Sequence, residues 1–142
     1  MSLLLAVPSL LVLAVAPDYV TVRATFEPPT TPGGDGAIVV TLTPKESDIR
    51  VNENPSPRLR LAEGQPILID KQPAPSRSTP VDPAQAKYLD PAQPVRFAVA
   101  IAPKAPKGAS NVSGTLTYFF CSKGQGWCRK GTADVSVRVD VR

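Results

Sequence analysis

Residues 112–141 read VSGTLTYFFCSKGQGWCRKGTADVSVRVDV, and this stretch decides the fold of the chain. Val112–Phe120 is rich in β-branched and aromatic residues, and Thr132–Val141 alternates between apolar and polar side chains. Both patterns predict β-strands, the second with one face buried and the other in water. The spacer between Cys121 and Cys128 holds two glycines, which favours a tight turn. The stretch therefore predicts a β-hairpin whose end carries two cysteines that can form a short-loop disulfide.

Six other segments, bounded by proline or glycine turns, have the same short, apolar or alternating character. They are Tyr19–Phe26, Ala37–Leu42, Ile49–Val51, Leu59–Leu61, Pro66–Ile69 and Val95–Ala102. The proline-rich stretch Gln72–Pro94 is expected to be a long loop over one edge. No segment has a convincing helical period, so the chain is predicted to be all-β, a sandwich of about seven to eight strands. A small β-barrel is the alternative for the same pattern.

Length and composition indicate one domain with an aliphatic core. The chain has 142 residues, enough to bury a core without help from a disulfide. Hydrophobic residues make up 42% but aromatic residues only 6%, so valine, leucine, isoleucine and alanine must fill the interior. The net charge of +4 comes from scattered basic residues without aromatic interleaving, which excludes a nucleic-acid partner. Nothing in the sequence indicates an oligomer, and a monomer is expected.

The first residues have the pattern of an export signal. Leu3–Val15 is apolar but too short for a transmembrane helix, and Ala14–Ala16 fits the small-x-small cleavage pattern. We therefore expect a signal peptide over residues 1–16 and a mature domain over residues 17–142. A first apolar strand or a truncated start is the alternative. An even number of cysteines also suits an oxidising, periplasmic or cell-envelope compartment.

The absence of histidine removes several kinds of chemistry. Without it there is no Ser-His-Asp or Cys-His catalysis and no imidazole ligand for zinc. Two cysteines alone do not make a metal site, and no glycine-rich phosphate loop opens a helix. The sequence predicts no metal and no small-molecule cofactor, and it disfavours a conventional hydrolase. The cysteine pair is the remaining candidate for function.

Two interpretations of the cysteine pair remain open, so whether the chain is an enzyme is undecided. In the first, the pair exchanges disulfides with a partner, and Lys123, Arg129 and Lys130 would lower a thiol pKa. In the second, the disulfide is a structural staple in a non-catalytic interaction module. A closed loop of about eight residues contributes about 2.5 kcal/mol on the chain-entropy model, which a domain of this size does not need.

The hairpin from Gly114 to Cys128 resembles the amino-terminal (alpha) periplasmic domains of the thiol–disulfide interchange protein DsbD. Ile49–Pro55 is similar to a segment in which that family often carries His-x-Asn-x-Asn/His-Pro, and Val95–Ile101 fits the strand before the hairpin. The resemblance covers roughly Thr21–Val141. It implies an immunoglobulin-like sandwich that takes electrons from a membrane-linked thioredoxin-like module. Such domains pass these electrons to periplasmic oxidoreductases, including those of cytochrome c biogenesis.

The resemblance also implies roles for individual residues. By motif position, Cys128 is the sulfur joined to the partner and Cys121 the second, resolving thiol. Trp127 takes the place of an aromatic residue that packs beside the pair, and the remaining supporting residues are Phe120, Lys123 and Arg129. Family members cover the disulfide with a cap loop that bears an aromatic residue. Here the matching stretch, Pro73–Ala86, has none, and Tyr88 follows it.

Overall fold

The computed structural model describes residues 18–29, 34–72, 83–84 and 86–142. The signal peptide expected at residues 1–16 lies outside this part of the chain, as do residues 73–82 and 85 of the proline-rich stretch Gln72–Pro94. None of the described residues forms a helix long and apolar enough to span a bilayer.

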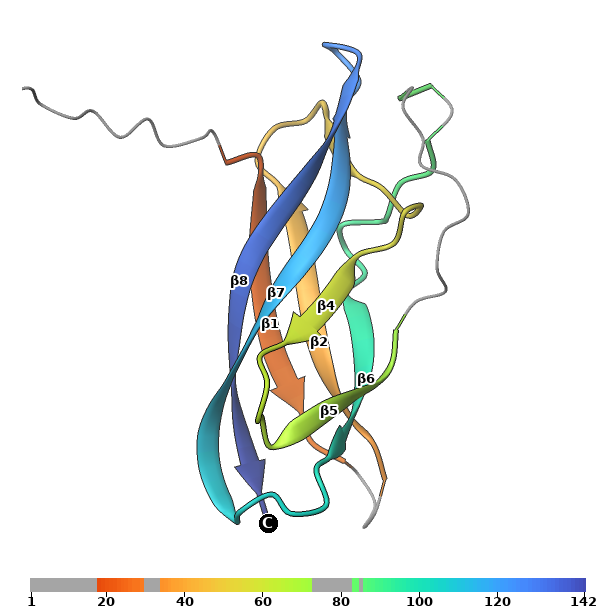
Figure 1. Cartoon of the computed structure of the whole chain (residues 1–142). Coiled ribbons are helices and arrows are strands. Elements are labelled where there is room, and N and C mark those ends of the chain that lie inside the picture. Colours follow the sequence, from red (N-terminus) through yellow and green to blue (C-terminus); the bar gives the residue numbers. More distant parts are fainter. Residues whose placement is uncertain (1–17, 30–33, 73–82, 85) are drawn as a thin grey trace, which may run out of the picture.

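Eight strands form two antiparallel sheets that face each other (Figure 1). The strands are β1 (Val20–Glu27), β2 (Gly36–Pro44), β3 (Ile49–Val51), β4 (Arg58–Leu61), β5 (Ile67–Lys71), β6 (Val95–Ile101), β7 (Gly108–Ser122) and β8 (Trp127–Val141). The first sheet has the order β1–β2–β6–β5. In the second, β7 is central, with β8 on one side and β3 and β4 in succession along the other. The predicted all-β sandwich is confirmed.

The strand order gives the type of sandwich. In the constant-type immunoglobulin fold, strands A, B, E and D form one sheet and strands C, F and G form the other. The first sheet matches A–B–E–D when β1, β2, β6 and β5 take those letters. The second matches C–F–G, because β3 and β4 together occupy the place of strand C beside β7. The sheet order is therefore immunoglobulin-like, as the resemblance implied.

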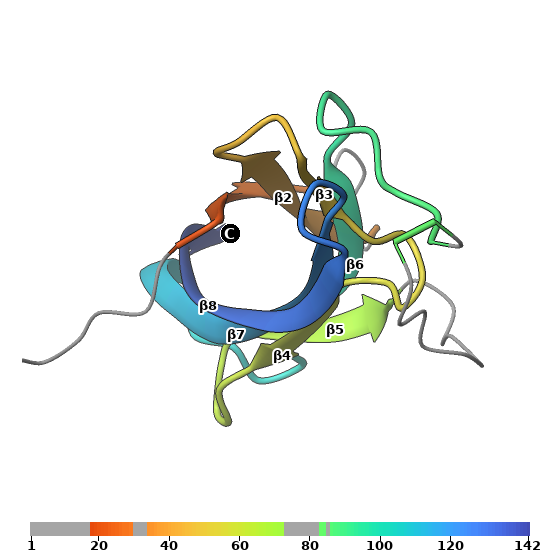
Figure 2. The ribbon, with the colours of Figure 1, turned by 90° about the horizontal axis from the view of Figure 1, so that it is seen from above.

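The core between the sheets is aliphatic, as the composition predicted. Its largest fully buried side chains are Phe97, Ile38, Ile49, Leu59, Ile67, Leu116, Val40, Val99, Val112 and Val139. Along β8 the alternating valines point inward and the polar residues between them are exposed. Figure 2 looks down the sandwich and shows the strands curving around this core. Alternation along the strands therefore sets which side chains of β7 and β8 face the solvent.

One side-chain amide links the two sheets. Gln72, just after β5, donates from Nε2 to the carbonyl of Leu59 in β4 at 2.8 Å. Its Oε1 accepts the Leu59 N–H at 3.1 Å. The amide thus satisfies both backbone groups of Leu59, as a neighbouring strand would.

The strands of the hairpin are longer than the sequence indicated. The prediction began β7 at Val112 and β8 at Thr132, whereas the strands begin at Gly108 and Trp127. Gly131 interrupts the alternating pattern, but it pairs with Tyr118, whose ring lies over it. Pairing across the hairpin therefore carries β8 through Gly131 as far as Trp127.

Candidate functional site: the hairpin disulfide

The end of the β7–β8 hairpin carries the disulfide that the sequence predicted. Cys121 and Cys128 are directly opposed in the register of the two strands, their Cα atoms are 4.0 Å apart, and their sulfurs are bonded. Directly opposed side chains of an antiparallel pair point to the same face and have neighbouring Cβ atoms. The pairing continues to Ser122 and Trp127, so the cysteines lie within the strands.

The turn beyond the disulfide is fixed by local hydrogen bonds. Gly126 has a φ of 72°, a conformation that glycine adopts without steric cost, and its N–H donates to the Ser122 carbonyl at 2.9 Å. The Ser122 hydroxyl accepts the Gln125 N–H at 3.1 Å and donates to Asp48 Oδ2 at 2.7 Å. Because Asp48 directly precedes β3, the turn is held against the start of that strand.

Alternation along the strands separates the disulfide from the aromatic residues expected beside it. Neighbouring residues of a strand point to opposite faces, so Trp127 points away from Cys128 and Phe120 away from Cys121. Trp127, Phe120 and Tyr19 pack together with ring centroids 5.3 to 5.7 Å apart, and Phe120 belongs to the buried core. The two predicted supporting aromatics therefore brace the hairpin from its inner face, and the sulfurs lie on its outer face.

The predicted cations are divided between the same two faces. The Arg129 guanidinium stacks 4.0 Å from the centroid of the Trp127 ring, so it covers the aromatic cluster rather than the sulfurs. Lys123 Nζ lies 5.3 Å from the centroid of the ring of Tyr88, and Tyr88 belongs to a segment beside the disulfide. Lys130 is exposed and, by alternation, shares the face of the disulfide. Of the predicted cations, Lys123 and Lys130 thus lie on the side of the hairpin that carries the disulfide.

The two cysteines differ in exposure. Cys121 is completely buried, with an exposed fraction of 0%, whereas Cys128 is partly exposed. Cys121 lies in the central strand, between Arg50 of β3 and Cys128 of β8 in the register. Cys128 lies in the last strand of its sheet. A thiolate arriving from solution can therefore reach Cys128 more readily than Cys121.

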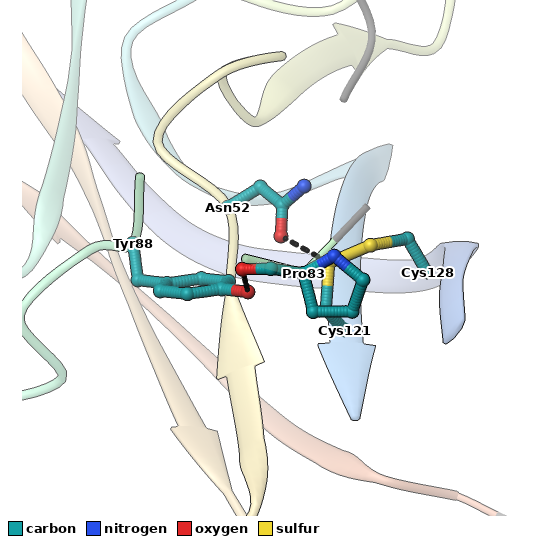
Figure 3. The surroundings of a disulfide bond; sticks show 5 residues. All are labelled: Asn52, Pro83, Tyr88, Cys121 and Cys128. Carbon is teal, nitrogen blue, oxygen red and sulfur yellow. Dashed lines mark hydrogen bonds between the residues drawn. A yellow bond between two sulfur atoms is a disulfide. The ribbon is translucent and has the colours of Figure 1, made fainter. Parts of the chain in front are cut away.

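Three residues from two distant segments surround the disulfide: Asn52, Pro83 and Tyr88 (Figure 3). Asn52 and Tyr88 form an isolated antiparallel bridge, and the Leu89 N–H donates to the Val51 carbonyl at 2.8 Å. The Tyr88 hydroxyl donates to the carbonyl of Pro83, a buried residue, at 2.7 Å. Tyr88 therefore fixes Pro83 beside the disulfide.

The sequence did not identify Asn52 or Pro83 as part of the site. The stretch Pro73–Ala86 was expected to correspond to the cap loop of the family and to lack its aromatic residue. Residues 73–82 and 85 of this stretch lie outside the described part of the chain. Of its described residues, Pro83 lies beside the disulfide and is held by the aromatic residue that follows the stretch. The one available signal for Asn52 was its place in the segment Ile49–Pro55, which is similar to a segment of the DsbD amino-terminal domains.

Replacing Tyr88 with phenylalanine should loosen the attachment of Pro83 beside the disulfide. The change removes the hydrogen bond to the Pro83 carbonyl, so we expect the free energy of unfolding to fall by about 1 kcal/mol. We also expect dithiothreitol to reduce the disulfide faster, measured by thiol appearance under native conditions. Tyr19→Phe is the matched control, because Tyr19 packs on the inner face of the hairpin. Equal reduction rates in Tyr88→Phe and the native protein would show that Tyr88 does not protect the disulfide.

No metal centre accompanies the disulfide in the described part of the chain, where no three histidine, cysteine or acidic side chains gather as ligands.

Comparison with known proteins gives no match to a family model, a curated protein or a solved structure.

Proposed function

We propose that the chain is a thiol–disulfide exchange domain in which Cys128 is the sulfur that partners attack. The observation that carries this proposal is the unequal exposure of the two cysteines, with Cys121 buried and Cys128 reachable. Exchange proceeds when a thiolate attacks one sulfur of a disulfide and the other sulfur leaves. When one cysteine is buried and the other is partly exposed, the partly exposed residue is the one attacked and the sulfur of the buried residue leaves.

The reaction has two balanced steps. A partner thiolate attacks Cys128 Sγ, the Cys121–Cys128 bond breaks, and its electron pair leaves on Cys121 Sγ. The second thiol of the partner, as thiolate, then attacks the partner's own sulfur in the mixed disulfide and releases Cys128 as a thiolate. The partner is thereby oxidised and the domain reduced by two electrons. The reverse sequence passes the electrons to an oxidised protein.

The resemblance to the DsbD amino-terminal domains supplies the partners in this proposal. A thioredoxin-like protein or membrane electron-transfer partner reduces the domain, which then reduces exported oxidoreductases in the periplasm or cell envelope. The immunoglobulin-like sheet order and the hairpin position of the disulfide agree with that family. In this proposal the domain acts as a monomer and uses no cofactor.

A second candidate function is favoured by the place of the disulfide in the hairpin. It joins directly opposed residues near the end of the two longest strands, where a cross-link holds the strand ends together. In that case the domain is a non-catalytic interaction module, and the disulfide is a structural staple.

The reduction potential of the Cys121–Cys128 pair distinguishes the two functions. We expect a value of roughly −120 to −270 mV, the range of exchange catalysts, measured by equilibration with glutathione or dithiothreitol buffers. A staple would give a value below about −300 mV. A potential in that lower range would overturn the exchange proposal.

A further inference from the structure

The Asn52 side chain is buried against the disulfide without a complete set of hydrogen bonds. Its exposed fraction is 0%, and Oδ1 lies 3.2 Å from Cys121 Sγ (Figure 3). Its Nδ2 has no hydrogen-bond partner within the described part of the protein. The backbone of Asn52 is fixed, because its N–H donates to the Phe119 carbonyl at 2.8 Å. A buried amide with an unsatisfied donor is costly, so its place beside a sulfur calls for a physical reason.

The oxidation state of Cys121 decides whether the Asn52 amide has a hydrogen-bond partner on the sulfur. In the disulfide the sulfur carries no hydrogen, so the contact between Sγ and Oδ1 is not a hydrogen bond. After reduction, a Cys121 thiol can donate its S–H to Oδ1. A half-turn of the amide exchanges Oδ1 and Nδ2, and Nδ2–H can then donate to a Cys121 thiolate. Both protonation states of reduced Cys121 thus gain a partner that the oxidised form lacks.

We propose that Asn52 stabilises Cys121 as the leaving sulfur and shifts the cysteine pair toward its reduced form. The inference deepens the proposed exchange function and rests on it. When a thiolate bonds to Cys128 Sγ, the electron pair of the broken bond resides on Cys121 Sγ. This sulfur is buried away from water, so the amide N–H replaces the solvent as its hydrogen-bond donor.

The first test replaces Asn52 with leucine, which has a similar shape and no hydrogen-bonding group. We expect the equilibrium with a glutathione redox buffer to move toward the disulfide by about fivefold, the factor that corresponds to one neutral hydrogen bond. Gln72→Leu is the matched control. It also removes a partly buried amide, but one that bonds to Leu59 and contacts neither cysteine. It should lower stability and leave the glutathione equilibrium unchanged.

The second test measures the pKa of the Cys121 thiol directly, by the ultraviolet absorbance of its thiolate in a Cys128→Ala background. We expect Asn52→Leu to raise this pKa by about one to two units, because the thiolate loses a donor. Asn52→Asp preserves the shape and remains informative if the leucine variant does not fold. We expect it to raise the pKa further, because a carboxylate only accepts hydrogen bonds and repels the thiolate.

The other charged or titratable groups around Cys121 are unchanged in these variants. They are Arg50 on β3, Tyr88 in the segment beside the disulfide, Lys123 and Asp48 at the turn, and Lys130 on β8. An unchanged pKa and glutathione equilibrium in the Asn52 variants would overturn the inference. Both measurements use small thiols or none, so they give an answer even if no protein partner exchanges with Cys128. Failure of the Asn52 inference is therefore distinguishable from failure of the proposed function.

Discussion

A Cys121→Ala variant is expected to react with a partner disulfide roughly tenfold faster than a Cys128→Ala variant. Each variant has a single thiol, and the two thiols differ in their surroundings. The Cys128 thiol is partly exposed on the last strand of its sheet, whereas Cys121 is completely buried. The measurement is the rate of mixed-disulfide formation with a purified thioredoxin that lacks its resolving cysteine and carries an activated disulfide. Iodoacetamide alkylation followed by mass spectrometry gives a second, partner-free rate.

The matched control for this prediction is the same pair of variants in urea. Unfolding removes the difference in burial, so the two thiols should then react at similar rates. Equal rates in the folded proteins, or a faster reaction at Cys121, would contradict the role of Cys128 as the attacked sulfur. Faster alkylation of Cys128 without mixed-disulfide formation would favour the structural staple.

Gly114→Ala is expected to lower the free energy of unfolding by about 3 kcal/mol, the upper part of the range for an overpacked site. A Cβ atom at this position would lie 2.6 Å from the carbonyl oxygen of Arg60 and 3.1 Å from Leu61 Cδ2. Both residues belong to β4, which pairs with β7 at this point. A backbone oxygen cannot rotate away as a side chain can, so β4 must move as a unit. Urea denaturation of the oxidised protein measures the loss.

Gly131→Ala is the comparison for this substitution. Its Cβ would also approach another atom to 2.6 Å, but that atom is Cζ of Tyr118, at the far end of a side chain. We expect a smaller loss, about 1 kcal/mol, because the ring can shift. If Gly114→Ala were as stable as the native protein, or cost less than Gly131→Ala, the close packing of β4 on β7 would be disproved.

The fold was largely predictable because proline, glycine and alternation define the strands locally. β3 has the predicted bounds Ile49–Val51, and the other strands were found with shifted ends. The largest errors lie in the hairpin, where pairing between β7 and β8 extends the strands beyond what either sequence segment indicates alone. Tyr118 opposite Gly131 is such a case, since the glycine is acceptable only because the ring of its cross-strand partner covers it.

The site was only partly predictable, because its second half comes from distant segments. The disulfide follows from the spacing of Cys121 and Cys128 in one hairpin. Asn52 lies 69 positions before Cys121, and only the resemblance of the segment Ile49–Pro55 to a family segment connects it with the hairpin. The family resemblance also placed Trp127 beside the cysteines, by its position in the motif. In a strand, neighbouring side chains point to opposite faces. The predicted strand began at Thr132 and did not reach Trp127, so this rule was not applied to Trp127.

The two faces of the β7–β8 hairpin can change independently in evolution. Side chains on the inner face pack in the core, so substitutions there change the stability of the fold. On the outer face, Lys130 and Thr132 follow Cys128 at alternate positions and are exposed. Substitutions at these positions leave the core untouched and alter the exposed surface beside Cys128. The outer surface beside the disulfide and the packing that keeps the disulfide in place therefore depend on different side chains of the same two strands.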